Sequence, residues 1–177
     1  MGYAFIKRVR DTCPQTRIIF IAGNHEDRIR RFAWDHPNLS SLRFFTIEEM
    51  LGLRQFDIEY LPYPHSLILN NFYIAHGKNV NQQSAYTAKN LLHKKMMSGL
   101  TNHVHRMGSH FLTSPGGDFE FHENGCMCEL VAEYEPEPNW QQGFGVLRMF
   151  PEGNIFEPIP IKNNALSYGG QLFRAST

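Results

Sequence analysis

The sequence has little cysteine, no excess of either charge and no long apolar run. Its 177 residues contain three cysteines, an odd number that argues against a disulfide framework. Lysine plus arginine equals aspartate plus glutamate at 17 each, so no net charge draws the chain to nucleic acid or an anionic membrane. No apolar stretch is long enough to span a bilayer, and the N-terminus lacks the features of a signal peptide. These absences predict a cytoplasmic protein that does not bind membranes.

The composition is that of a folded protein with a core. A hydrophobic fraction of 42% and a charged fraction of 19% are typical of globular chains, and we expect one domain over residues 1–177. Cys126 and Cys128 have the spacing C-x-C, which would place both on one face of a strand. Two small buried thiols are the simpler explanation of this pair, and zinc ligation is the alternative.

Gly23-Asn24-His25-Glu26 is the stretch around which the rest of the chain is organised. It follows the short β-branched and aromatic run at residues 17–22, which predicts a buried strand of a parallel sheet. A helix is predicted from residue 26 to residue 34. Asn24 and His25 then lie on the turn at the carboxyl end of a strand, where α/β sheets place their ligands. The alternative is a plain glycine turn leading into a capped helix.

The remaining elements follow from local patterns. An amphipathic helix at residues 4–10 leads into the strand at residues 17–22, so the chain is expected to begin in the middle of a fold. Thr46 with Glu49 is a capping pattern for a helix that Gly52 ends. Asn70-Asn71 predicts a tight hairpin between strands at residues 66–69 and 72–75. Further segments are a half-exposed strand at 56–60, a helix at 83–97, and an antiparallel meander of strands at 118–121, 127–134, 143–150 and 155–161 that would form a second sheet.

Three histidines follow predicted strands or helices and can face the same rim. His76-Gly77 ends the strand at residues 72–75, and the glycine clears room beside the ring. His103 and His105 are two apart on an extended segment, so both rings point the same way. Imidazoles suit zinc, iron, manganese and similar cations. Each histidine also has an ordinary explanation, as a ring satisfied by backbone or by solvent. His110 and His122 are interpreted as surface or core histidines.

The order of these motifs resembles the calcineurin-like metallophosphoesterases. That family's pattern runs D-x-H, G-D-x-x-D, G-N-H-D/E, H and G-H-x-H. Residues 23–26 match the third motif, His76 matches the lone histidine, and residues 102–105 match the last one with Asn102 in place of glycine. Residues 139–146 also look like phage and prophage members. The resemblance implies a two-sheet α-β-β-α sandwich with a two-metal site.

The resemblance assigns a role to each matching residue. Asn24 would bind one metal and hydrogen-bond the phosphate, and His25 would protonate or stabilise the leaving group. His76 and His103 would complete the shell of the second metal, and His105 would bind the first. The cofactors would be divalent cations, with Mn²⁺ expected and Zn²⁺, Fe or Ni²⁺ as alternatives. Two such cations would share a hydroxide that attacks the phosphorus in line.

The first two motifs of the family are missing. No D-x-H and no G-D-x-x-D precedes Gly23, and Gly117-Asp118 falls after the last histidine motif in a predicted turn. These motifs supply most ligands of the first metal, so the chain is expected to lack the first βα elements of the fold. An apolar strand edge at residues 18–21 would then be open, which favours a homo-oligomer.

The expected function is metal-dependent hydrolysis of a phosphoester. The substrate class stays open between a phosphomonoester, a cyclic phosphodiester or nucleotide, and nucleic acid. One alternative is a non-catalytic binding or assembly module that retains the fold with a vestigial metal site. Another is a mononuclear zinc hydrolase that uses His76, His103 and His105 alone.

Overall fold

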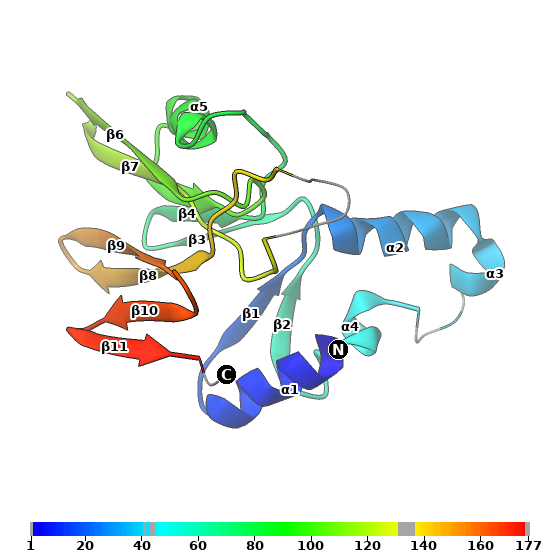
Figure 1. Cartoon of the computed structure of the whole chain (residues 1–177). Helices are drawn as coiled ribbons and strands as arrows, with labels where there is room; N and C mark the ends of the chain where they lie inside the picture. Colours follow the sequence, from blue (N-terminus) through cyan, green and yellow to red (C-terminus); the bar gives the residue numbers. More distant parts are fainter. Residues whose placement is uncertain (1, 41, 43–44, 131–136, 176–177) are drawn as a thin grey trace. The chain divides into compact units, whose positions relative to one another are not determined.

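The computed structural model describes residues 2–40, 42, 45–130 and 137–175. The chain divides into two compact units, unit 1 over Met1–Ser66 and unit 2 over Leu67–Thr177, and each is described by itself. Both contain helices and strands (Figure 1), which agrees with the predicted α/β class. Within the described ranges no helix is long and apolar enough to cross a membrane.

Unit 1 contains a short parallel sheet. Its elements are α1 (Gly2–Thr12), β1 (Ile18–Ile21), α2 (Asn24–Asp35), α3 (Pro37–Ser40), α4 (Ile47–Met50) and β2 (Ile58–Leu61). β1 and β2 pair in parallel with Ile18 opposite Ile58, as the apolar run predicts. The prediction that β1 is fully buried is wrong, because each of its residues is only partly buried. Among the described residues β1 pairs with β2 alone, which leaves it less covered than a central strand.

The core of unit 1 lies between α1 and β2. Ile6, Leu53 and Ile58 form a buried cluster, and the partly buried Ile18 and Phe20 pack against it. Ile18 and Phe20 are two apart along β1 and therefore share one face of the sheet. The amphipathic pattern of the first helix thus marks the face that is buried.

Helix ends in unit 1 follow the predicted capping chemistry. The Thr46 hydroxyl accepts a hydrogen bond from the Glu49 amide at the start of α4. Gly52, with φ of 67°, follows α4 in the left-handed conformation that glycine adopts freely. At α2 the Glu26 carboxylate accepts from the Gly23 amide at 2.7 Å, which caps the first turn. The helix begins at Asn24, two residues earlier than predicted.

Unit 2 is built on a five-stranded mixed sheet. Its elements are β3 (Ser66–Leu69), β4 (Phe72–Ala75), α5 (Tyr86–Lys95), β5 (Gly99–Thr101), β6 (Gly108–Ser114), β7 (Gly117–Glu123), β8 (Gly143–Phe150), β9 (Gly153–Pro160), β10 (Ala165–Tyr168) and β11 (Gln171–Arg174). The strand order is β3-β4-β5-β7-β6, with β4, β5 and β7 parallel to one another and β6 antiparallel to β7. β8–β9 and β10–β11 are separate antiparallel hairpins.

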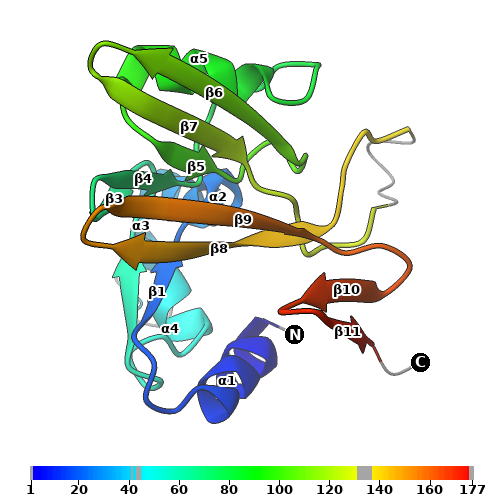
Figure 2. The same cartoon turned by 90° about the vertical axis from the view of Figure 1, so that its left-hand side faces the viewer.

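The five-stranded sheet is covered on both faces (Figure 2). On one face α5 contributes Ala88 and Leu92, which are buried against Phe121 of β7. On the other face Phe156 of the β8–β9 hairpin is buried with Phe72 of β4 and Leu100 of β5. Unit 2 is therefore layered as helix, sheet and hairpin. Because the carboxyl ends of β4 and β5 meet at one edge of this sheet, the residues that follow them are neighbours.

The predicted hairpin at Asn70-Asn71 is confirmed. Both residues have positive φ, 44° and 61°, between β3 and β4. β8 has the predicted bounds. β7 is longer than the predicted strand at both ends, and β9 begins two residues earlier and ends one residue earlier than predicted. The predicted meander is wrong as one sheet, because β7 joins the sheet of β4 and β5 while β8–β9 stands apart.

Two further boundaries differ from prediction. The helix expected at residues 83–97 is shorter, because Ala85 and Met96 both take a left-handed conformation and bound α5. No strand covers the described part, 127–130, of the segment predicted as a strand, and residues 131–134 of that prediction lie outside the described ranges. Cys126 instead pairs with Gln142 in an isolated bridge.

Candidate functional site

His76 and His103 come together at the ends of two adjacent parallel strands. His76 follows β4 directly, and His103 is the second residue after β5. The Nε2 atom of His76 lies 3.0 Å from the Nδ1 atom of His103, with both residues partly buried. Two imidazole nitrogens that face each other at this distance can share a proton or a cation.

The backbone around His76 fixes this pair. The His76 carbonyl accepts hydrogen bonds from the His103 amide at 2.8 Å and from the Thr101 hydroxyl at 2.9 Å. Gly77 has φ of 88°, and a Cβ atom there would lie 2.1 Å from Thr101 Oγ1. The position therefore requires glycine, but the reason is its left-handed backbone and the close approach of Thr101, not room beside a histidine ring.

Asn102 braces the turn between Thr101 and His103. Its side-chain amide donates to the Ala75 carbonyl at 3.2 Å, and its side-chain oxygen accepts from Asn124 Nδ2 at 2.9 Å. The Asn124 amide in turn donates to the Thr101 carbonyl at 2.8 Å. Asn102, which replaces the glycine of the family pattern, thus ties the ends of β4, β5 and β7 together.

Asn24 and His25 lie at the start of α2 in unit 1, after the carboxyl end of β1. Asn24 is partly buried and His25 is exposed. They follow β1 as predicted, but they are the first two residues of α2 and not part of the turn before it, and the Glu26 side chain caps that helix. Because they belong to unit 1, their convergence with the histidines of unit 2 stays a prediction.

Asp27 is a buried carboxylate that sequence analysis did not single out. It is 4% exposed and accepts from Arg30 Nε and Arg31 Nε, each at 2.7 Å. Burial by itself raises the pKa of Asp27, but the hydrogen bonds and charges of the two arginines outweigh it and hold that pKa below its usual range. Asp27 is thus an ionised structural group on the first turns of α2.

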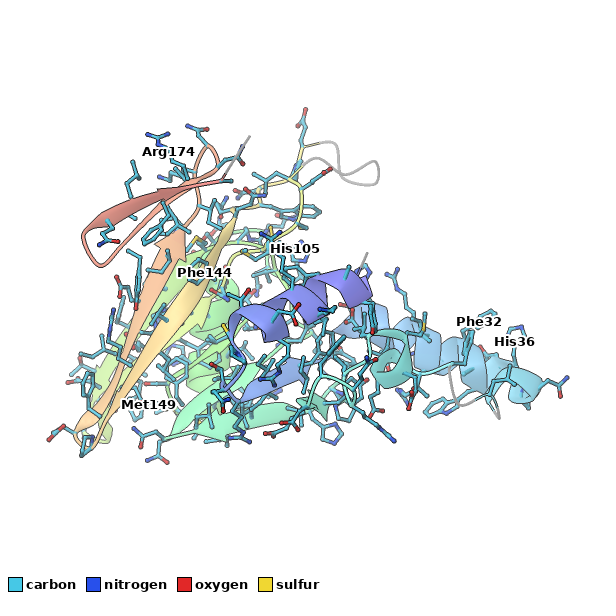
Figure 3. All side chains as sticks on the ribbon, turned by 90° about the horizontal axis from the view of Figure 1, so that it is seen from below. Phe32, His36, His105, Phe144, Met149 and Arg174 are labelled. Atoms are coloured by element: carbon cyan, nitrogen blue, oxygen red, sulfur yellow. The ribbon has the colours of Figure 1, made fainter. Side chains whose placement is uncertain are left out.

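His105 lies apart from the strand pattern, in a left-handed conformation with φ of 57° (labelled in Figure 3). Its ring meets the Trp140 ring edge-on, with centroids 4.8 Å apart. Its ligand nitrogen and the sulfur atoms of Cys126 and Cys128 all lie within 4.8 Å of one another. This is a group of three metal-ligating side chains from distant parts of the sequence.

The prediction that Cys126 and Cys128 share one face of a strand is wrong. Cys126 is buried, Cys128 is exposed, and neither lies in a strand. Burial, together with the neighbouring Cys128, raises the pKa of the Cys126 thiol to about 11. The C-x-C spacing was the only sequence signal for this cluster. The contribution of His105 comes from the tertiary fold and could not be read from spacing.

His122 lies in the core, and His110 lies on β6, where its ring is 5.8 Å from that of His93. The His122 ring is 2% exposed, stacks on Phe156 at 4.1 Å and shares a 2.8 Å hydrogen bond between its Nδ1 and Ser109 Oγ. Burial, followed by the charges of Lys89 and His93, lowers the pKa of His110. Gly117-Asp118 begins β7 at the β6–β7 hairpin, so it is not the second family motif.

No protein-family model, no curated protein and no solved structure matches the chain. The function is therefore argued from the geometry of these residues.

Proposed function

We propose that the chain carries part of a metal-dependent phosphoester hydrolase site, centred on His76 and His103. The observation that supports this most directly is the 3.0 Å separation of their facing nitrogens at the ends of β4 and β5. Carboxyl ends of parallel strands are where α/β proteins place ligands. The order of motifs along the chain, G-N-H-E, H-G and H-x-H, adds the resemblance to the metallophosphoesterases.

The separation of the two nitrogens fits a shared cation. Imidazole nitrogens bound at about 2.1 Å to one ion lie about 3.0 Å apart at a right angle and about 3.4 Å apart at the tetrahedral angle. Without a cation the same distance is a hydrogen bond in which one neutral ring donates and the other accepts. Metal binding therefore needs no rearrangement of the strands, but the ring that donates must move its proton to its other nitrogen, so that both facing nitrogens are free to bind the cation.

In this proposal each residue of the family pattern keeps its role. As the resemblance implies, His76 and His103 would hold one divalent cation together with Asn24, His105 would be a ligand of the other, and His25 would protonate the leaving group, which would add about 10²–10⁴-fold. The cations would supply Lewis-acid chemistry, neutralising phosphoryl charge and lowering the pKa of the attacking water. The finer fold, a two-sheet α-β-β-α sandwich, is part of the proposal. The helix, sheet and hairpin layers of unit 2 support it.

The ligand count bears on activity. Across the described part of the chain, no third His, Cys, Asp or Glu joins His76 and His103 in a metal-ligating group. This favours a second candidate, a binding module that retains the fold and a weak metal site without turnover. It also leads us to expect weak Mn²⁺ binding and slow hydrolysis from the chain of 177 residues as it stands.

The first prediction concerns these two histidines. His76→Ala and His103→Ala should each weaken Mn²⁺ binding at least tenfold, because each removes a direct ligand, and should abolish Mn²⁺-dependent hydrolysis of a chromogenic phosphodiester. His110→Ala is the matched control, since its ring lies on β6 and contacts His93 instead. Mn²⁺ binding is measured by electron paramagnetic resonance.

The same variants separate the two candidate functions. If the two variants lose Mn²⁺ binding and the unsubstituted chain shows no hydrolysis, the chain is the binding module. If the unsubstituted chain hydrolyses the substrate, and His76→Ala and His103→Ala each lose both Mn²⁺ binding and hydrolysis, the chain is an enzyme. Equal Mn²⁺ affinity in His76→Ala, His103→Ala and His110→Ala would refute both.

A further inference from the structure

We propose that His105, Cys126 and Cys128 form a second metal site, selective for zinc-class ions and independent of the His76–His103 pair. Two thiol sulfurs and one imidazole nitrogen gather within 4.8 Å of one another, from the turn after β5 and the loop after β7. Thiolate sulfur selects zinc-class ions over Mn²⁺ and Mg²⁺, and the site proposed around His76 and His103 has no thiolate ligand. The site therefore differs in chemistry from the one proposed for phosphoester hydrolysis.

The distances fit zinc with little movement. Around a tetrahedral zinc ion, sulfur and nitrogen ligands lie about 3.6–3.8 Å from one another. The three donors already lie inside 4.8 Å. A small rotation of the exposed Cys128 side chain would close the remaining distance.

A backbone frame holds the ligands in place. The segment before β8 runs between them, and its Gln141 amide donates to the His105 carbonyl at 3.0 Å while its carbonyl accepts from the Cys126 amide at 3.0 Å. Gln142 Nε2 donates to the Cys128 carbonyl at 2.7 Å. All three ligand residues are thereby tied to one short stretch. The Cys126 thiol also donates to the Gln141 carbonyl at 3.7 Å, and metal binding would replace this one bond while leaving the others in place.

Gly125 shows how closely these segments approach. A Cβ atom on Gly125 would lie 2.6 Å from the Gln141 carbonyl oxygen and 2.9 Å from the Gly143 amide nitrogen. Any other residue would push the cysteine loop away from residues 141–143. The close approach keeps Cys126 beside His105, as a preorganised metal site requires.

Metal binding at this cluster would join three segments that are far apart in sequence. These are the turn at His105, the loop at Cys126 and Cys128, and residues 139–143. The described residues supply three ligands, which leaves a fourth position for water or another donor, and the exposure of Cys128 gives an ion a path from solvent. The ring nitrogen of His105 used here is then unavailable to the proposed first metal of the phosphoester site.

The competing chemistry is a disulfide between Cys126 and Cys128. It would engage both thiols, leave His105 out and require an oxidant. A metal site requires the reduced thiols and His105 together. The experiment therefore keeps the thiols reduced and includes a variant of His105.

The test uses the full chain purified under reducing conditions and titrated with Co²⁺ and then Zn²⁺ under argon. We expect one equivalent of Co²⁺ to produce sulfur-to-cobalt charge-transfer absorption, which Zn²⁺ then displaces. Cys126→Ser, Cys128→Ser and His105→Ala should each weaken binding by more than about 100-fold, because each removes a direct ligand. Cys13→Ser is the matched control. Cys13 is a free cysteine that directly follows α1 in unit 1, so its loss should leave Co²⁺ and Zn²⁺ binding unchanged.

A second measurement requires no variant. In the unsubstituted chain, Zn²⁺ should protect Cys126 and Cys128, but not Cys13, from alkylation as followed by peptide mass spectrometry. Absence of the charge-transfer band, equal protection of all three cysteines, or a Cys126–Cys128 disulfide that forms regardless of Zn²⁺ would each overturn the proposal. His76→Ala should leave the cobalt spectrum unchanged, so this outcome and the fate of the phosphoester proposal are separable.

Discussion

At the residue scale, the histidines of unit 2 differ by what their rings touch. His122 stacks on Phe156 in the core, and its Nδ1 shares a hydrogen bond with the Ser109 hydroxyl. His76 and His103 instead face each other across 3.0 Å at a strand edge. The facing nitrogens of His76 and His103 can bind one cation, which the ring of His122, enclosed in the core, is not placed to do.

The prediction at Asp27 concerns stability. Asp27→Asn should lower the free energy of unfolding by about 1–2 kcal/mol at pH 7, because it removes a buried charge paired with two arginines. The expected loss is small because the side chains of Arg30 and Arg31 are 44% and 68% exposed, so solvent screens their interaction with Asp27. Urea unfolding followed by circular dichroism measures the difference, with the exposed Asp35→Asn as control.

The pH dependence of this difference has a definite sign. The pKa of Asp27 is lowered on folding from its usual value of 3.8, so its stabilisation is complete above that value. It is lost as the pH falls through the lower pKa of the folded state. The gap between the original chain and Asp27→Asn should therefore shrink below about pH 4 and be constant from pH 5 to pH 7. A gap that grows with acid would contradict the assignment.

At the element scale, local chemistry predicted the turns and caps well. Asn70-Asn71 and Thr46 needed only near neighbours to specify a hairpin and a helix start. The start of α5 was missed because it depends on Glu123, 38 residues from Ala85. The strand expected after Met127 was missed because Cys126 pairs with only Gln142 through a single bridge, which no periodicity reveals.

The candidate site residues also divide into those that sequence patterns could predict and those that they could not. The pairing of His76 with His103 could be anticipated because both follow strands whose carboxyl ends share an edge. The cluster of His105 with Cys126 and Cys128 could not, since it depends on where residues 139–143 pass between them. Sequence patterns report neighbours along a strand or helix, whereas this cluster depends on three loops.

Glu123 carries the prediction for α5. Its buried carboxylate accepts hydrogen bonds from the backbone amides of Ala85, Thr87 and Ala88, at 3.0, 2.8 and 3.1 Å. Glu123→Gln removes the negative charge that faces the N-terminus of α5. It also places the glutamine NH₂ group next to at least one backbone N–H, where two donors face each other without an acceptor. We expect a loss of about 1–3 kcal/mol in the free energy of unfolding. Thermal and urea unfolding measure it, and Glu152→Gln in the exposed β8–β9 turn is the control, with no loss expected.

At the scale of the whole molecule, the edge of β1 leads us to predict self-association. In the part of the chain that the structure describes, β1 pairs on one side only, with β2. An apolar strand with an unpaired edge is a template for another chain. The mass in solution, measured by analytical ultracentrifugation, should rise above 20.5 kDa with increasing concentration.

A charge at this edge should reduce association. Ile19 is opposite Glu59 and lies on the face of β1 away from the Ile18 and Phe20 positions, so Ile19→Lys spares the core cluster. Val80→Lys places the same charge at an exposed loop position and is the control. Association that is unchanged by Ile19→Lys, or a monomer at every concentration, would rule out the β1 edge as the contact.

The edge-on contact between Trp140 and His105 has an optical consequence. The chain has only two tryptophans, and Trp34 lies on α2, where the Arg30 guanidinium covers its ring at 4.1 Å. Trp34→Phe would leave Trp140 as the single indole emitter, with an imidazole 4.8 Å away. A change of charge on that imidazole alters the field across the indole and hence the wavelength and yield of its fluorescence. Trp140 is thus a built-in spectroscopic probe of whatever His105 binds.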